Sequence, residues 1–186
     1  NTVLGLDALD AAVTGQYNTA IGNLALTLNT SGTSNTAIGN EVLEVNTTGS
    51  YNTGVGSFAL DKNTTADNNT GVGFNCLSSA TTGGDNTAMG RNALAIGTTG
   101  TANTVVGANA MEDTTTGSNS VAIGHHALHA NTTAGSNLAV GWYAAATSQT
   151  ATRVTALGHQ ALQFNTHSDN TAVGYTTMQN NTSGIY

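Results

Sequence analysis

The chain has 186 residues, of which only three are lysine or arginine and ten are acidic, so its net charge is −7. Three cations cannot neutralise a useful run of phosphates, which argues against a nucleic-acid partner. The single cysteine excludes an intrachain disulfide and a cysteine-based zinc site, and no apolar run is long enough to predict membrane insertion.

The chain is built from a repeated unit whose most regular residue is a glycine. The glycine recurs every 17 residues, except that the last interval is 16, which indicates a one-residue deletion near Ser168 and Asp169. The eleven glycines are Gly5, Gly22, Gly39, Gly56, Gly73, Gly90, Gly107, Gly124, Gly141, Gly158 and Gly174. A fixed frame of this length predicts a repeat protein. We expect residues 1–186 to be a single repeat domain and a piece of a longer fibre.

Within each unit the expected elements follow one another in a fixed order. A segment such as residues 18–22 comes first, with asparagine four residues before the glycine in nine of eleven copies and an apolar residue directly before it. An Ala-Leu pair such as residues 25–26 follows, and a turn such as Asn-Thr-Thr-Gly at 46–49 closes the unit. Ile, Val and Thr favour strands, while Asn and Gly favour turns. The order predicts two short strands and two turns per unit.

The period selects the architecture. Seventeen residues are too few for the paired helices of helical repeats, but they suit one coil of a β-solenoid. We therefore predict an all-β solenoid of eleven coils, hydrogen-bonded at a spacing of about 4.8 Å into a rod of roughly 50 Å. Equivalent residues should stack into ladders in which asparagines bond amide to amide. The repeated glycines are expected at sharp turns with positive φ.

Adjacent apolar residues lead to a prediction about assembly. Side chains alternate between the two faces of a strand, whereas pairs such as Ala20-Ile21 and Ala25-Leu26 are both apolar. We expect the Ile/Val and Leu columns to fill the coil and the Ala columns to face outward. Such an outward stripe predicts a side-by-side oligomer and a poorly stable isolated protomer.

Several of these segments resemble a known family. Residues 18–22 and 35–39 (Asn-Thr-Ala-Ile-Gly), 86–90 (Asn-Thr-Ala-Met-Gly) and 119–124 (Asn-Ser-Val-Ala-Ile-Gly) resemble the head repeats of trimeric autotransporter adhesins. The longer unit, with Ala-Leu and Asn-Thr-Thr-Gly, is similar to repeats in bacteriophage tail fibre proteins, and the resemblance covers essentially the whole chain. It implies a left-handed parallel β-roll, a homotrimer, and display outside a cell or virion. The unit differs in period from the adhesin head, so no receptor residues are carried over.

The function expected from these features is that of an extracellular fibre segment. In a phage tail fibre or a bacterial surface adhesin it would be a rigid trimeric shaft that also contacts host-cell glycans or receptors. One alternative is a self-assembling extracellular filament whose uncapped ends stack. Another is an ice-binding solenoid, although the regular Thr of the Asn-Thr-Thr segment is expected in turns rather than on a flat strand face. We expect neither an enzyme nor a cofactor.

A variable column directly after the glycine holds the candidate binding residues. Its last four members carry rings that are expected to stack along the rod, and the next column adds His126 and Tyr143. The residues expected to contact a glycan or receptor are His125, Trp142, Tyr143, His159 and Tyr175. An exposed aromatic strip suits the CH-rich faces of sugars. The alternative is a ladder that stabilises the rod or lies at the trimer interface.

The histidines also raise the question of a metal site. His125 and His126 would point to opposite faces of a strand. Two coils would separate His125 from His159 by roughly 10 Å, which is too far for one zinc ion. No metal site is therefore predicted.

Two other sets of residues invite a chemical interpretation. Four acids share the column five residues after the glycine, where a solvated face is favoured over a calcium site or a pair of catalytic carboxylates: Asp10, Glu44, Asp61 and Glu112. Cys76 replaces the usual alanine before leucine and is expected to be a small packed residue.

Overall fold

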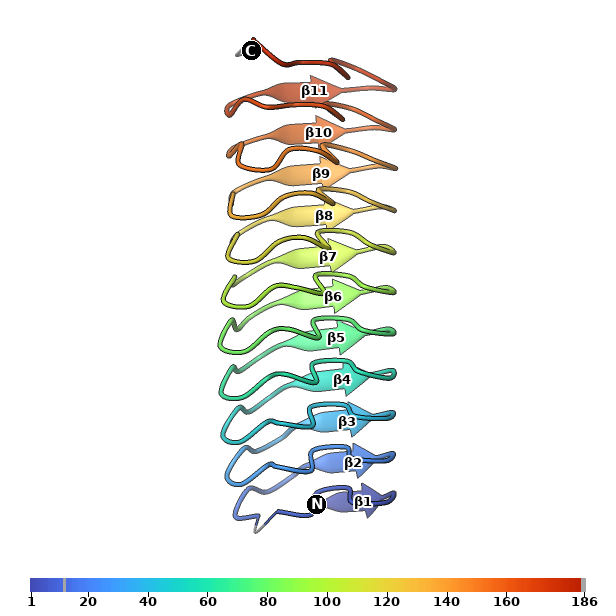
Figure 1. Ribbon diagram of the computed structural model, residues 1–186, viewed down its shortest axis with the longest axis vertical. Helices are drawn as coiled ribbons and strands as arrows, with labels where there is room; N and C mark the ends of the chain where they lie inside the picture. Colours follow the sequence, from blue (N-terminus) through green and yellow to red (C-terminus); the bar gives the residue numbers. More distant parts are fainter. Residues whose placement is uncertain (12, 185–186) are drawn as a thin grey trace.

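The computed structural model describes residues 1–11 and 13–184, and over these residues the chain is a straight β-solenoid with its first and last coils at opposite ends (Figure 1). Eleven strands stack into one parallel sheet in chain order, so the predicted all-β solenoid of eleven coils is confirmed. The strands are β1 (Thr2–Leu4), β2 (Thr19–Ile21), β3 (Thr36–Ile38), β4 (Thr53–Val55), β5 (Thr70–Val72), β6 (Thr87–Met89), β7 (Thr104–Val106), β8 (Val121–Ile123), β9 (Leu138–Val140), β10 (Thr155–Leu157) and β11 (Thr171–Val173). Each coil is numbered here after its strand.

The strand register keeps equivalent residues of the repeat in contact. Thr19 pairs with Thr36 and Ile21 with Ile38, 17 residues apart. Between β10 and β11 the offset falls to 16, because Thr155 pairs with Thr171. The deletion therefore leaves the strand register intact.

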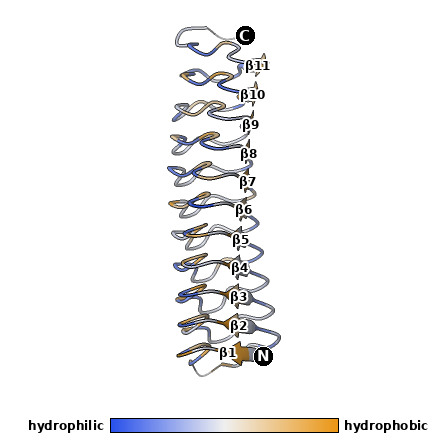
Figure 2. Ribbon diagram, turned by 90° about the vertical axis from the view of Figure 1, so that its right-hand side faces the viewer, coloured by the Kyte–Doolittle hydropathy of each residue, from blue (hydrophilic) through white to orange (hydrophobic). Residues whose placement is uncertain are grey.

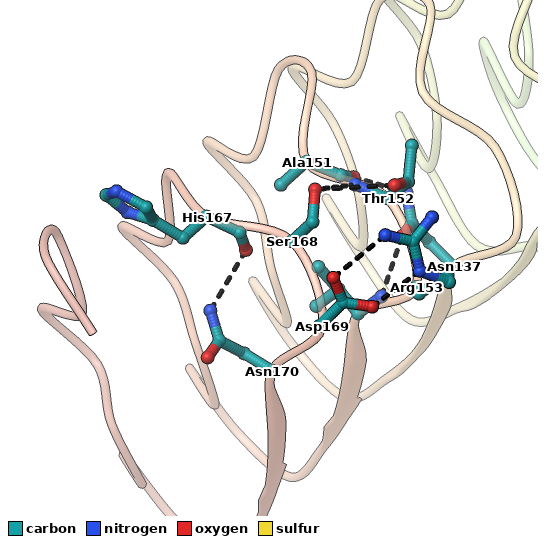
Figure 3. A network of polar contacts seen from close by, with 9 residues as sticks. Asn137, Ala151, Thr152, Arg153, His167, Ser168, Asp169 and Asn170 are labelled. Atoms are coloured by element: carbon teal, nitrogen blue, oxygen red, sulfur yellow. Dashed lines mark hydrogen bonds and ion pairs between the residues drawn. The ribbon is translucent and has the colours of Figure 1, made fainter. Parts of the chain in front are cut away.

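The deletion is absorbed in the outer turn before β11, shown in Figure 3. There the Thr152 amide donates to Ser168 Oγ at 3.0 Å, while Asn170 Nδ2 donates to the His167 carbonyl at 2.9 Å. Because a turn can lose a residue without changing how the strands pair, the ladder continues into the last coil.

In the described part of the chain each coil contains one strand, so the prediction of two strands per coil is wrong. The Ala-Leu segment is not extended, since Leu24 and Leu26 have φ of 57° and 54°. Its amides still bond to other coils, but in alternating directions: Leu24 donates to the coil before, at 2.9 Å, and Leu26 to the coil after, at 3.0 Å. Left-handed backbone costs about 1–2 kcal/mol per residue. These hydrogen bonds and the burial of the leucine offset that cost.

The repeated glycines lie directly after the strands, where the chain turns. Across the described coils their φ values run from 117° at Gly56 to 147° at Gly5, which confirms the prediction of positive φ. A Cβ on Gly90 would lie only 2.6 Å from the carbonyl oxygen of Gly107 in the next coil. Glycine is therefore required both by the backbone conformation and by the close approach of successive coils.

The interior of the solenoid is lined by the leucine column, as predicted, and by small residues of the strands, which reverses the predicted orientation of the strands. The middle residue of each strand from β2 to β11 is buried, as Ala20 and Ala37 are with no exposed surface, while Ile38 is 38% exposed. The Ala and Leu of the Ala-Leu pair are both buried, as Ala25 and Leu26 show. The outward stripe is thus made by the Ile/Val column, because the narrow space between the sheet and the buried leucines admits only alanine, glycine or an occasional valine.

Two asparagine ladders satisfy the buried backbone at the edges of this core. In the first, the Asn52 amide donates to Asn35 Oδ1 at 2.9 Å, and Asn35 Nδ2 donates to the Gly49 carbonyl at 2.8 Å. In the second, Asn46 Nδ2 donates to Asn29 Oδ1 at 2.7 Å. The predicted amide-to-amide ladder is confirmed from Asn29 to Asn63, where it ends at an Asn63 Oδ1 that has no hydrogen-bond partner among the described residues.

The fit of the core predicts opposite effects for two glycines in one column. A Cβ on Gly54 would lie 2.5 Å from Val42 Cγ1, whereas a Cβ on Gly71 would meet nothing closer than 3.4 Å. Gly54→Ala should lower the free energy of unfolding by about 1–3 kcal/mol through overpacking. Gly71→Ala should be neutral or stabilise by up to about 1 kcal/mol. Chemical denaturation measures both.

Pairing the variant with Val42→Ala tests the cause. If the contact with Val42 is responsible, Val42→Ala with Gly54→Ala will be more stable than the sum of the two single effects. Strict additivity would show that Gly54 is needed for another reason.

Candidate binding surface

The rod presents open surfaces rather than a cavity. Within residues 1–11 and 13–184 no pocket is present. Among the same residues no three histidine, cysteine or acidic side chains are placed to hold a metal ion together. No helix in the described chain is long and apolar enough to cross a membrane.

Seven rings at the C-terminal end of the rod form one continuous cluster, called the ring cluster below. Its members are His125, His126, His129, Trp142, Tyr143, His159 and Tyr175. All five residues that the sequence predicts for glycan contact belong to it, together with His126 of the neighbouring column, and the structure adds His129. The cluster spans coils 8 to 11 just beyond the ends of their strands, where each glycine turns the chain away from the sheet.

One part of the ring cluster is a stack that runs along the rod. Trp142 and His159 have ring centroids 4.6 Å apart and planes inclined by 20°. His159 and Tyr175 are 4.9 Å apart and inclined by 18°. The expected stacking of rings from successive coils is confirmed for these residues. Both faces of the His159 ring are therefore covered by its neighbours.

The other part of the cluster surrounds His126. Its ring stacks on Tyr143 at 4.7 Å and meets His125 and His129 edge to face at 4.1 and 4.5 Å. The sequence predicted that His125 and His126 point to opposite faces of a strand, and this prediction is wrong. They follow the glycine in a turn, and His126 has φ of 57°, which brings the two rings into contact.

The electrostatic environment of the cluster is set by the histidines and two neighbouring charges. Burial is the largest cause that lowers the pKa of His126, and the nearby His125, His129 and Arg91 lower that pKa further. His129 Nδ1 lies 3.6 Å from a Glu112 oxygen and 3.3 Å from the Asn109 carbonyl. The cluster therefore resists protonation at its centre while one edge is paired with an acid.

A second surface, called the strand face below, consists of the outward residues of all eleven strands. The first strand position is threonine in nine coils, Val121 in β8 and Leu138 in β9. The third position is always aliphatic or methionine, and Met89 and Ile123 are 48% and 39% exposed. Neither column contains a charged residue. The strands form one side of the rod and the turns the other, so these columns make a flat uncharged face (Figure 2).

Two single residues differ in how well the sequence described them. Cys76 is buried and packed as expected, and burial raises the pKa of its thiol to about 12. Asp61 is not on a solvated face: burial raises its pKa, although Lys62 Nζ lies 2.9 Å from the carboxylate. Most residues five positions after the glycine are at least partly buried, because each follows an apolar residue that packs in the core.

Comparisons with known proteins do not extend this description. No family model matches the chain, no curated protein matches it, and no solved structure matches it. The likeness to adhesin and tail fibre repeats therefore rests on the repeat residues themselves.

The lowered pKa of His126 predicts acid sensitivity. The folded state disfavours the imidazolium, so the unfolded chain binds more protons as pH falls through the usual histidine pKa of about 6.5. The stabilisation from neutral His126 is complete above that pH and is lost as pH falls toward the lower, folded-state pKa. His126→Asn, which matches Asn109 in the preceding coil, should reduce the fall in melting temperature between pH 7.5 and 5.5.

The matched control is His167→Asn, in the outer turn and away from the cluster. An equal reduction in both variants would contradict a special role for His126.

Proposed function

We propose that this chain is a rigid fibre segment that works in a side-by-side homotrimer outside the cell, as part of a phage tail fibre or a bacterial surface adhesin. The strand face is the observation that carries the proposal. It replaces the alanine stripe that the sequence suggested as the oligomer seam.

The composition of the strand face supports close association. An aliphatic column runs along every coil with no charge to interrupt it, and contiguous exposed apolar surface of this kind marks interaction sites. Partners that pack against it would remove these side chains from water, at roughly 25 cal/mol per Å² of apolar area.

The remaining columns support the role of a shaft. Successive coils are hydrogen-bonded through strands, turns and asparagine ladders, which gives the rod a fixed length per repeat. Variable residues are confined to outward columns, where the ring cluster offers a surface for a host-cell glycan or receptor. These outward columns can change without disturbing the core.

Sedimentation of the chain and of charged variants tests the assembly. We expect a trimer that Met89→Lys with Val106→Lys converts to monomers, because burying two lysines in an apolar seam costs several kcal/mol. The matched control is Thr99→Lys with Thr116→Lys on exposed turn residues of the same region, which should remain trimeric.

A wild-type chain that sediments as a stable, monodisperse monomer would refute the proposal. Electron microscopy of the same sample separates rods of fixed length from long filaments, which would instead favour end-to-end stacking.

A second candidate function is ice binding, and the strand threonines favour it. The turn threonines donate their hydroxyls to the next coil, as Thr47 Oγ1 does to the Thr64 carbonyl at 3.0 Å. The strand threonines are a separate column on the flat face. Their positions repeat at about 4.8 Å along the rod and lie about 6.6 Å from the aliphatic column. This regular array of hydroxyls and methyls can order water.

Trimer assembly and ice binding would both use the strand face. Sedimentation and thermal hysteresis, measured on the same sample, therefore distinguish the two functions. If ice binding is the function, the chain will be a monomer that shows thermal hysteresis. Thr87→Lys with Thr104→Lys should then abolish the hysteresis, and Thr99→Lys with Thr116→Lys should preserve it. A trimer without hysteresis excludes this candidate.

A further inference from the structure

The stacking in the ring cluster determines which part of each ring a ligand can meet. Trp142, His159 and Tyr175 lie face to face along the rod, so their faces are largely occupied by one another. A ligand beside the stack meets ring edges. Aromatic edges carry partial positive charge and faces partial negative charge. The stack therefore favours oxygen-rich, negatively charged groups over the CH-rich faces of neutral sugars.

The histidine nitrogens add hydrogen-bond donors to these edges. In the described chain, Nδ1 of His126 and of His159 is buried and has no hydrogen-bond partner. A neutral imidazole carries one proton, and an N–H group buried without an acceptor is costly. The proton is therefore favoured on Nε2, at the other end of each ring, where it can be donated to a ligand.

The charges near the ring cluster favour an anionic ligand. From coil 4 to coil 11 the segments that run from each strand to its leucine column contain no acid, a property the cluster shares with neighbouring coils; they are 53–60, 70–77, 87–94, 104–111, 121–128, 138–145, 155–162 and 171–178. Arg91, one of only three cations in the chain, lies in the column of the ring stack and is exposed. Only Ala108 separates it from His125 in that column. Glu112, an acid of coil 7, is engaged by Asn92 Nδ2 at 3.2 Å and by His129.

We propose that the ring cluster and Arg91 bind a linear glycan that carries carboxylates and lies along the rod. Arg91 and the Nε2–H edges of the histidines contact carboxylates, and the side-chain amides of Asn109 and Gln160 lie in the adjacent column to contact hydroxyls. The proposal rests on the proposed function as a surface-binding fibre and names the class of ligand.

Charge attraction contributes to the expected binding, because glycan carboxylates are ionised at neutral pH and the guanidinium of Arg91 stays protonated. The titratable groups and charges at the surface are Arg91, Glu112, Tyr143, Tyr175 and the histidines 125, 126, 129 and 159. Glu112 is the one acid among them, and salt should weaken the interaction.

Binding of the chain to immobilised polygalacturonate, with dextran as the neutral glycan and polyphosphate as a non-glycan polyanion, tests the proposal. We expect polygalacturonate to bind at least about tenfold more tightly than either at neutral pH and low salt, and less tightly in high salt. Arg91→Gln and His159→Gln should each weaken binding severalfold. The controls Arg153→Gln and His167→Gln make the same chemical changes elsewhere and should leave binding unchanged.

Several results would overturn the proposal: no binding to polygalacturonate, equal binding to dextran, preference for polyphosphate, or equal effects of Arg91→Gln and Arg153→Gln. Circular dichroism of each variant checks that the rod remains folded. Sedimentation of the same samples keeps the two ideas apart. A trimer that binds no acidic glycan contradicts only the ligand, whereas a monomer that binds through Arg91 contradicts only the assembly.

Discussion

Hydrogen bonding between successive coils is the interaction on which the rest of this protein depends. Each coil pairs with the next in register, so a residue meets its own equivalent about 4.8 Å away. This closeness is why glycine is required after every strand: a Cβ on Gly22 would lie 2.1 Å from the carbonyl oxygen of Gly39. It is also why asparagines form ladders and why rings of successive coils stack. A side chain that recurs in one column of the repeat therefore contacts its equivalents in the neighbouring coils.

The narrow interior is the second constraint. Between the sheet and the buried leucines there is room for one small side chain per coil. A larger side chain in one coil therefore requires a smaller residue in the next coil. Val42 occupies the place of an alanine, and Gly54 in the next coil leaves space for it. Because the core is filled by alanine and leucine, the larger β-branched residues of the strands have to face outward. The fold thus produces its own exposed apolar face.

Function is then a matter of what the outward columns carry. The strand face is nearly uniform, which suits association with copies of itself or contact with another periodic surface. The ring cluster is confined to coils 8 to 11 and is chemically distinct from the acidic remainder of the rod. A uniform face and a local cluster on the same scaffold separate assembly from recognition, since substitutions in one column leave the other in place.

The sequence by itself determined the period, the number of coils, the positions of the glycines and asparagines, and the stacking of His159 between Trp142 and Tyr175. These follow from spacing alone, because in-register coils bring equivalent positions together. The sequence did not reveal the left-handed backbone of Leu24 and Leu26, since leucine has no preference for that conformation. It also failed to show that Ala20 faces inward and Ile21 outward. Both residues are apolar, so only the width of the coil, a property of the tertiary structure, decides which of them is enclosed.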